Sequence, residues 1–514
     1  MSGISQSKTS ASHAEPTIDW SVFVPTFIMV ALLGGALIGF QDASNQWVAD
    51  AVSFIKTNLS WLYLLIGLGA LFFCGWLAFG PYGGMKLGAD DEQPEFTTPH
   101  WVAMMFTAGI GAGLIVWGFA EPIYYIQTPP FGITPHSDLA FEWAHVYPLF
   151  HWGVIPWAVY AVPAIPIAYL LYRRRESHLR ISHTLSDSFP GAKHPAIASF
   201  IDILIMLGIL GGTATSLGLG VPLVSSFLSA LTGMEDSVTL KFIVLFGYTL
   251  IFGASAYRGL KKGIKVLADI NMVLAIIMML FILLIGPTVF ILSLSVNSLG
   301  MFFDNFWRMS LWTDPITQSG FPEDWTVFYW AWWIAFAAFI GLFFGRISRG
   351  RTIRQVVLGI IGLGSLGTTF FLLIAGGYSL HLEQSGALAV SEVLSEHGLS
   401  YTVTAVLSQL PFGKLTLLAF FILALIFYAT TLDSAAYVLA SVSSKDLRND
   451  QEPPRANRLI WAFALAFFTA GLIKAGSLSI VQSMTIVFSL PIIPILVLMS
   501  LSLVKWLRAD PYRQ

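Results

Sequence analysis

Three tryptophans, Trp330, Trp332 and Trp333, stand within four positions of one apolar stretch that is long enough to cross a membrane. Tryptophan commonly gathers where a membrane helix meets the lipid headgroups, because its ring is apolar and its N–H seeks water. Trp332 and Trp333, however, lie well inside the stretch and are followed by small residues. At least one indole should therefore face the protein interior, where a ring face can hold a quaternary ammonium group, which has no N–H to donate.

A second set of aromatic rings lies in the apolar stretch 140–172, at Trp152, Trp157 and Tyr160. At about 100° per residue, Trp157 and Tyr160 fall on neighbouring positions of a helix. Pro156 distorts the helix locally, so that Trp152 can turn toward the same side. The pattern predicts three rings that line one cavity suited to a cation.

Glycines at alternate positions interrupt the apolar stretch 100–126. Glycine in a helix interior costs about 1 kcal/mol relative to alanine, so this run predicts local unwinding; close helix packing through small residues is the alternative. Small residues recur after Trp333, at the corresponding place in the stretch 325–345. The residues assigned to the helix break are Gly109, Ile110, Gly111, Ala112 and Gly113.

Hydroxyl groups cluster in two further stretches, at Thr213, Thr215 and Ser216 and at Thr430 and Thr431. Such hydroxyls often bond back to their own helix or to a neighbouring one. Beside an unwound helix with free carbonyl groups, they can instead complete the all-oxygen coordination that sodium prefers. Both interpretations are open from these residues alone.

The composition indicates an all-α integral membrane protein. Of the 514 residues, 56% are hydrophobic and 11% are charged, and the mean hydropathy is +0.73, whereas soluble proteins carry about a quarter charged residues. A net charge of −2 gives no reason to expect a nucleic-acid partner. We find no metal-ligand spacing and no nucleophile–base set, so we expect no enzyme activity and no cofactor beyond a coupling ion. A channel would require a symmetric pore ring instead of a closed aromatic box.

Twelve stretches reach the roughly 20 apolar residues that a spanning helix needs. They are 22–40, 59–79, 100–126, 140–172, 197–230, 239–257, 264–295, 325–345, 356–378, 402–443, 459–474 and 480–504. Lys and Arg accumulate in cytoplasmic loops, and this topology puts 22 of the 27 basic residues on one side. We therefore expect both termini to be cytoplasmic, in a plasma (bacterial inner) membrane. Charged residues inside the stretches are candidates for function or for pairing; they include Glu142, Asp202, Asp269 and Asp433.

The third and the eighth stretches each begin a block of five. Paired interruptions at corresponding positions of two halves indicate a secondary transporter with inverted repeats and a binding site near the midplane. We therefore predict two extra helices, two inverted five-helix repeats and a surface helix between the repeats. The divisions are a tail (1–20), spans 1–2 (21–98), the first repeat with spans 3–7 (99–296), an extracellular helix or loop (297–324), the second repeat with spans 8–12 (325–504) and a short tail (505–514).

Three segments resemble the betaine/choline/carnitine transporter family. They are residues 150–160, residues 325–333 and the basic run 346–354 with its four arginines. The resemblance extends from about Trp20 to the last span, and the tryptophan segment with its basic continuation is highly specific. It implies a LeuT-like core of two inverted repeats, usually assembled as a homotrimer, that moves onium compounds across the bilayer by alternating access.

The resemblance also assigns the substrate-binding residues. It places the onium group among aromatic side chains. Tyr124, after Glu121-Pro122, matches a further ring of the carnitine branch, and Phe336 stands where betaine symporters commonly have tryptophan. These residues are Trp152, Trp157, Tyr160, Trp332, Trp333, Tyr124 and Phe336. The phenylalanine at 336 leaves the identity of the substrate open.

Family members that transport choline resemble one another in having an aspartate where this chain has Gly113. The glycine favours a zwitterion that carries its own carboxylate, such as glycine betaine or carnitine, which backbone N–H groups at the helix break could meet. Sodium-independent carnitine exchangers have arginine where Asn271 stands and lack the hydroxyl pair near 430, so the resemblance implies sodium symport. It places the ion at Thr107, Ile110, Phe427, Thr430 and Thr431, with a second site at Thr213, Thr215 and Ser216. A sodium-independent antiporter and a choline transporter are the alternatives.

Overall fold

The computed structural model of the chain describes residues 16–109, 113–176, 180–258, 261–445, 447, 451–475 and 478–510. Within these residues the structure is helical apart from one short pair of strands. The first elements are β1 (Thr17–Ile18), α1 (Trp20–Gly39), α2 (Gln41–Phe79), α3 (Thr98–Gly109), α4 (Gly113–Gln127), α5 (Asp138–His151), α6 (Val154–Ala168) and η1 (Tyr169–Arg173). They are followed by η2 (Ile181–Leu185), η3 (Pro190–Lys193), α7 (Pro195–Thr232), α8 (Val238–Arg258), α9 (Lys261–Ile285) and α10 (Thr288–Leu311).

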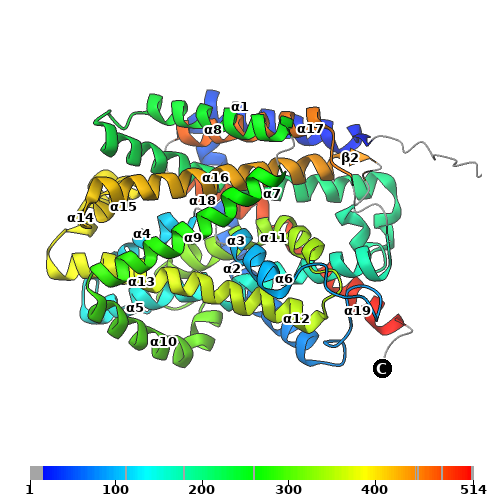
Figure 1. Ribbon diagram of the computed structural model, residues 1–514, viewed down its shortest axis with the longest axis horizontal. Helices are drawn as coiled ribbons and strands as arrows, with labels where there is room; N and C mark the ends of the chain where they lie inside the picture. Colours follow the sequence, from blue (N-terminus) through cyan, green and yellow to red (C-terminus); the bar gives the residue numbers. More distant parts are fainter. Residues whose placement is uncertain are drawn as a thin grey trace, which may run out of the picture.

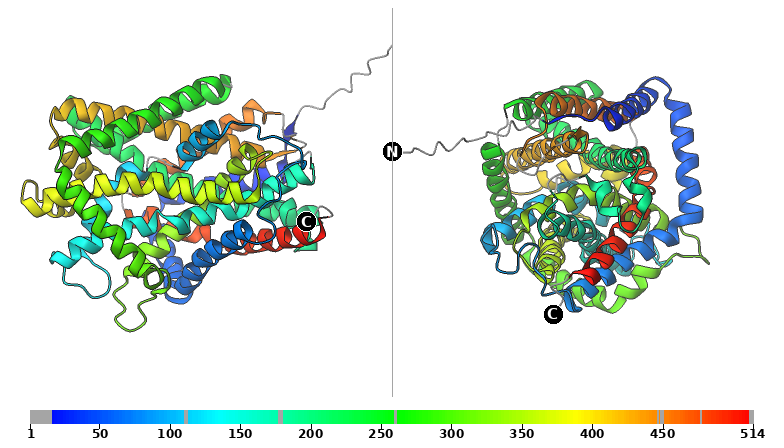
Figure 2. Two further views of the ribbon diagram at one scale, coloured as in Figure 1. Left: turned by 60° about the horizontal axis from the view of Figure 1, so that its bottom comes forward. Right: turned by 90° about the vertical axis from the view of Figure 1, so that its right-hand side faces the viewer.

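The second half of the chain is also mainly helical. Its elements are η4 (Pro322–Thr326), α11 (Val327–Ile347), α12 (Ile353–Leu358), η5 (Gly359–Leu363), α13 (Gly364–Ser385), α14 (Val390–His397), α15 (Leu399–Ser408), α16 (Gly413–Val442), β2 (Ser444–Lys445), α17 (Arg455–Ala475), α18 (Leu478–Ser489) and α19 (Ile492–Ala509). The long helices lie side by side in one bundle (Figure 1), and Figure 2 shows the bundle from two further directions.

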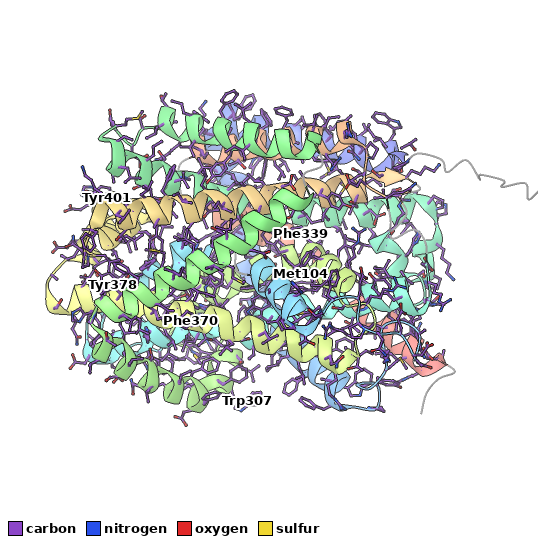
Figure 3. All side chains as sticks on the ribbon, viewed as in Figure 1. Met104, Trp307, Phe339, Phe370, Tyr378 and Tyr401 are labelled. Atoms are coloured by element: carbon purple, nitrogen blue, oxygen red, sulfur yellow. The ribbon has the colours of Figure 1, made fainter. Side chains whose placement is uncertain are left out.

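Helix α11, which carries the three tryptophans, lies in the middle of the bundle. It packs along α6 and also contacts α2, α7 and α18. Nearly all of its residues are buried, among them Phe339, which Figure 3 labels in the interior. An apolar helix that is buried all round belongs to the core of a large protein or of a membrane bundle.

The protein is a multi-pass membrane protein. Ten helical segments among the described residues are long and apolar enough to cross a membrane, as expected for helices whose backbone groups must be satisfied internally in lipid. Nine of the twelve predicted stretches each fall on one helical segment, whereas 100–126, 264–295 and 402–443 each extend over two described helices.

Several boundaries differ from the predicted ones where proline or glycine intervenes. The seventh stretch was expected to reach residue 295, but α9 ends at Ile285 and α10 begins at Thr288. Between them stand Gly286 and Pro287, and proline has no N–H with which to continue a helix. Helix α10 overlaps the segment expected to form a surface helix but begins earlier, and it is itself one of the ten candidate spans. Its exposed Trp307 lies at the edge of the molecule (Figure 3).

Both described ends of the chain lie at the same end of the bundle, beside the basic loops. Strand β1 pairs with β2, and Arg173 forms an ion pair with Asp510 at 3.0 Å.

The carboxylates of Glu92 and Asp187 lie at the same end of the bundle. The Ala89 N–H and then Arg349 lower the pKa of Glu92, and the Arg174 guanidinium lowers the pKa of Asp187, so both carboxylates favour the charged state that holds these loops together.

Candidate functional site

A break in the fourth predicted stretch positions the aromatic residues. Helix α5 ends at His151 and α6 begins at Val154, because Pro156 has no N–H to donate to the carbonyl oxygen of Trp152. That oxygen accepts instead from Thr368 Oγ1 at 2.7 Å. The carbonyl oxygen of His151 accepts from Trp333 Nε1 at 3.1 Å. The break therefore attaches α6 to both α11 and α13.

Four aromatic rings from α6, α11 and the break between α5 and α6 form one cluster, with Trp333 at its centre. The centroid of Trp333 lies 4.7 Å from that of Tyr160, 5.9 Å from Trp157 and 5.5 Å from Trp152. All four side chains are buried. The structure thus brings together four residues that the sequence separates into two segments, and we call these four rings the aromatic box.

Trp332 and Gly113 border the aromatic box. The ring of Trp332 lies 5.9 Å from that of Trp152 between centroids. A Cβ placed on Gly113 would lie 3.0 Å from Cη2 of Trp332 and 3.3 Å from Cη2 of Trp152. Gly113 is the first described residue of α4, so this part of the helix lies against the rings.

Trp330 has a different environment from Trp333. It is fully buried and lies 5.1 Å from Phe150 between ring centroids. A Cβ on Gly67 of α2 would lie 2.7 Å from its Nε1 atom. Trp330 therefore packs α11 against α2, and it belongs to the core.

Two assigned rings lie apart from the four. Tyr124 contacts Trp117 and Trp325, at 6.2 Å and 5.1 Å between centroids. Phe336 lies 5.7 Å from Phe339 and so close to α7 that a Cβ on Gly212 would be 2.7 Å from its Cδ2 atom. Trp117 also lies 6.0 Å from Tyr329, and Tyr329 lies 5.6 Å from Trp152, so other rings connect Tyr124 to the aromatic box. Phe336 lies against Gly212 of α7.

Gly364 closes one face of the aromatic box, and its substitution offers a test. A Cβ on Gly364 would lie 2.2 Å from Cδ2 of Trp157, which is a rigid ring atom. We expect Gly364→Ala to displace this indole and to destabilise the protein by about 1–3 kcal/mol through overpacking. Thermal unfolding of the purified protein measures the loss. Gly362→Ala is the matched control, because nothing lies within 4 Å of its Cβ position; equal melting temperatures of the two variants would contradict the expectation.

A buried carboxylate lies behind Trp152. Glu121 of α4 is fully buried, and its Oε2 accepts from Trp152 Nε1 at 2.9 Å and from the Tyr329 hydroxyl at 2.7 Å. Its Oε1 accepts from the Tyr125 hydroxyl at 2.6 Å, and His151 Nδ1 lies 3.2 Å away. We call Glu121 and these partners the Glu121 network.

Sequence reasoning did not identify the Glu121 network. It considered other charged residues within the apolar stretches and used Glu121 only to locate Tyr124. The signal was nevertheless present, since a carboxylate within an apolar helix is a candidate functional residue by its cost alone. Asp202, which was considered, is a paired residue: it accepts from Ser182 N at 3.1 Å and lies 3.3 Å from Arg180 Nε.

The residues assigned to sodium are only partly described. Ile110, Gly111 and Ala112 lie outside the described residues, as does the side chain of Thr107. Thr430 Oγ1 donates to the Phe427 carbonyl at 2.9 Å, and Thr431 Oγ1 donates to the same oxygen at 2.9 Å. Both hydroxyls therefore direct their hydrogens into the helix, which leaves oxygen lone pairs directed outward.

At the second assigned sodium site, one hydroxyl has no hydrogen-bond partner among the described residues. Thr215 Oγ1 donates to Gly211 O at 2.9 Å and also contacts Thr485 of α18, and Ser216 Oγ lies 3.3 Å from Gly212 O. Thr213 Oγ1 is buried and has no hydrogen-bond partner among the described residues. Both side-chain polar atoms of buried Asn271 are also without a partner there. Buried polar atoms of this kind require a ligand or water.

The rings of the aromatic box are suited to binding a methylated cation, because ring faces attract such cations through their quadrupoles. No group of three or more His, Cys, Asp or Glu that could hold a metal ion occurs in the part of the chain that the structure describes.

A family model described as the betaine/carnitine/choline family transporter matches residues 21–512. The match covers every helix of the aromatic box and of the Glu121 network.

Proposed function

The chain belongs to the betaine/carnitine/choline transporter family, and from this premise we propose that it imports a zwitterionic quaternary ammonium compound, such as glycine betaine or carnitine, by sodium-coupled symport. Members of this family are transporters of betaine, carnitine and choline. The observation that carries the proposal is the aromatic box with Trp333 at its centre, next to the first residue of α4.

The onium group is proposed to bind to the ring faces of the box. Each cation–π contact contributes about 0.5–2 kcal/mol, so several rings together give useful affinity without any N–H on the ligand. The centroids of Tyr160 and Trp333 are 4.7 Å apart, so a cation can lie within about 6 Å of both ring centroids at once.

The carboxylate of the zwitterion is proposed to face the N-terminus of α4. Gly113 is the first described residue of α4, and its Cβ position is close to Trp332 and Trp152. Without a side chain there, no fixed negative charge repels the substrate carboxylate, and the helix dipole favours it. This supports a zwitterion over choline.

Sodium is proposed to bind beside the helix break, at Thr107 and Ile110 of the first repeat and at Phe427, Thr430 and Thr431 of α16. Helix α16 packs against α9, and α9 also contacts α3, which brings the assigned elements together. The second site is proposed at Thr213, Thr215 and Ser216, where the buried hydroxyl of Thr213 is without a partner among the described residues.

The finer architecture is part of the same proposal. We infer twelve spans arranged as two inverted five-helix repeats in a LeuT-like core, with both termini cytoplasmic in a bacterial inner membrane. A homotrimer is proposed as the assembly, since α2 and α10 expose large apolar side chains such as Phe72 and Phe303 that lipid or a neighbouring protomer would cover.

Uptake into proteoliposomes tests this function. We expect labelled glycine betaine or carnitine to accumulate in empty vesicles when sodium is outside, and to stop accumulating when potassium replaces sodium. Uptake that does not depend on sodium but requires vesicles preloaded with substrate would establish exchange instead of symport. Accumulation of choline with no uptake of either zwitterion would contradict the proposed substrate class.

A further inference from the structure

Glu121 is the one carboxylate among the described residues that contacts the aromatic box. It reaches Trp152 Nε1 at 2.9 Å, and the opposite edge of the same indole faces Gly113. It also accepts from Tyr329, whose ring lies 5.6 Å from that of Trp152 between centroids. A single indole thus separates the carboxylate from the interior of the box.

Hydrogen-bonding groups surround Glu121. Trp152 Nε1 and the Tyr329 hydroxyl supply two protons to Oε2, and the Tyr125 hydroxyl supplies one to Oε1. His151 Nδ1 lies 3.2 Å from the same Oε1, and His151 Nε2 lies 3.1 Å from Thr326 Oγ1. Donors of this kind bind a carboxylate anion more strongly than a neutral acid.

No lysine or arginine among the described residues lies within ion-pair distance of Glu121, and its one ion-pair contact there is His151. A buried charge without a partner is costly, so a site that keeps one favours a ligand that supplies the opposite charge.

We propose that Glu121 is the fixed counter-charge of the bound onium group and a positioning residue of the aromatic box, acting on the substrate through Trp152. The proposal rests on the proposed function. The carboxylate holds the indole N–H, and its negative charge makes the far face of the same indole more attractive to a cation. Through His151, whose carbonyl oxygen accepts from Trp333 Nε1, the same network also fixes the central ring.

The expected effect follows from Coulomb's law. For two unit charges about 8 Å apart at an effective dielectric constant of about 20, the attraction corresponds to about a 30-fold change in affinity. The effect should be specific to the positive charge of the ligand and absent for a ligand of the same shape that lacks it. A substitution that only displaced the rings would weaken the binding of both ligands equally.

Paired ligands test the proposal in the purified full-length protein with sodium present. Calorimetry measures glycine betaine against 3,3-dimethylbutyrate, in which carbon replaces the onium nitrogen, and choline against 3,3-dimethylbutan-1-ol. In Glu121→Gln we expect each onium ligand to bind about 30-fold more weakly, with little change for its carbon analogue. In Glu121→Asp we expect the preference for the onium to persist while all affinities fall, because the shorter side chain keeps the charge but cannot reach its donors from both sides.

Glu142→Gln is the matched control, since it neutralises a half-buried carboxylate of α5 and should leave every affinity unchanged. Equal losses for onium and carbon ligands in Glu121→Gln, or no loss at all, would overturn the role of Glu121 while leaving the proposed function intact. If Glu121→Gln does not fold, unchanged affinities in Glu121→Asp overturn it. A wild-type protein that binds neither betaine, carnitine nor choline would overturn both proposals.

Discussion

Replacing Trp333 by leucine is expected to abolish uptake of the onium substrate. Trp333 is the one ring that contacts Trp152, Trp157 and Tyr160 together, so its loss removes one cation–π face and the support of three others. A single such contact is worth up to about 2 kcal/mol when desolvated, which alone weakens binding about 30-fold. Uptake into proteoliposomes and calorimetric binding of glycine betaine measure the effect.

Trp330→Leu is the matched control for this substitution. Both tryptophans are buried on α11, but Trp330 packs against Phe150 and Gly67. Its replacement should lower the melting temperature, because a large buried side chain is truncated, and should leave the affinity of the folded protein unchanged. Trp333→Phe should retain part of the binding, since a ring face remains. Normal uptake by the Trp333→Leu variant would show that Trp333 is not part of the binding site.

The architecture of the ring cluster could be predicted largely from residue types and spacing. Trp152, Trp157 and Tyr160 follow from helical periodicity with a proline-induced break, and Trp333 from tryptophans placed deep in an apolar stretch. Their assembly required the family resemblance, because spacing along one helix says nothing about which face of a distant helix it meets. The structure shows why they meet: the His151 carbonyl oxygen, at the break, holds the Trp333 N–H.

Other features could not be derived from the sequence for physical reasons. Glu121 is separated from Tyr329 by 208 positions, and only the packing of α4 on α11 and the break in the fourth stretch brings its donors together. Tyr124 and Phe336 were assigned by position in a family pattern, which does not say which rings each of them contacts. The end of α9 at Ile285 was missed because the apolar composition continues through Gly286 and Pro287 into α10.

Gly113 is the position at which the proposed preference for a zwitterion can be tested by a single substitution. Its Cβ position faces the edges of Trp332 and Trp152, and the choline-transporting members of the family that this chain resembles carry aspartate there. A carboxylate there would repel the carboxylate of a zwitterion and attract a cation that has none.

Gly113→Asp is therefore expected to convert the substrate preference from zwitterion to cation. At a separation of about 6 Å and an effective dielectric constant of about 20, each charge interaction corresponds to an about 100-fold effect on affinity, so choline gains and glycine betaine loses. The new Cβ would lie 3.0 Å from Cη2 of Trp332, and the ring must shift by a few tenths of an ångström, which lowers affinity for both ligands. Gly113→Asn has the same shape without the charge and isolates this steric part. Competition of unlabelled choline and betaine against labelled betaine measures the ratio; equal ratios in the two variants would show that the charge at this position does not select the substrate.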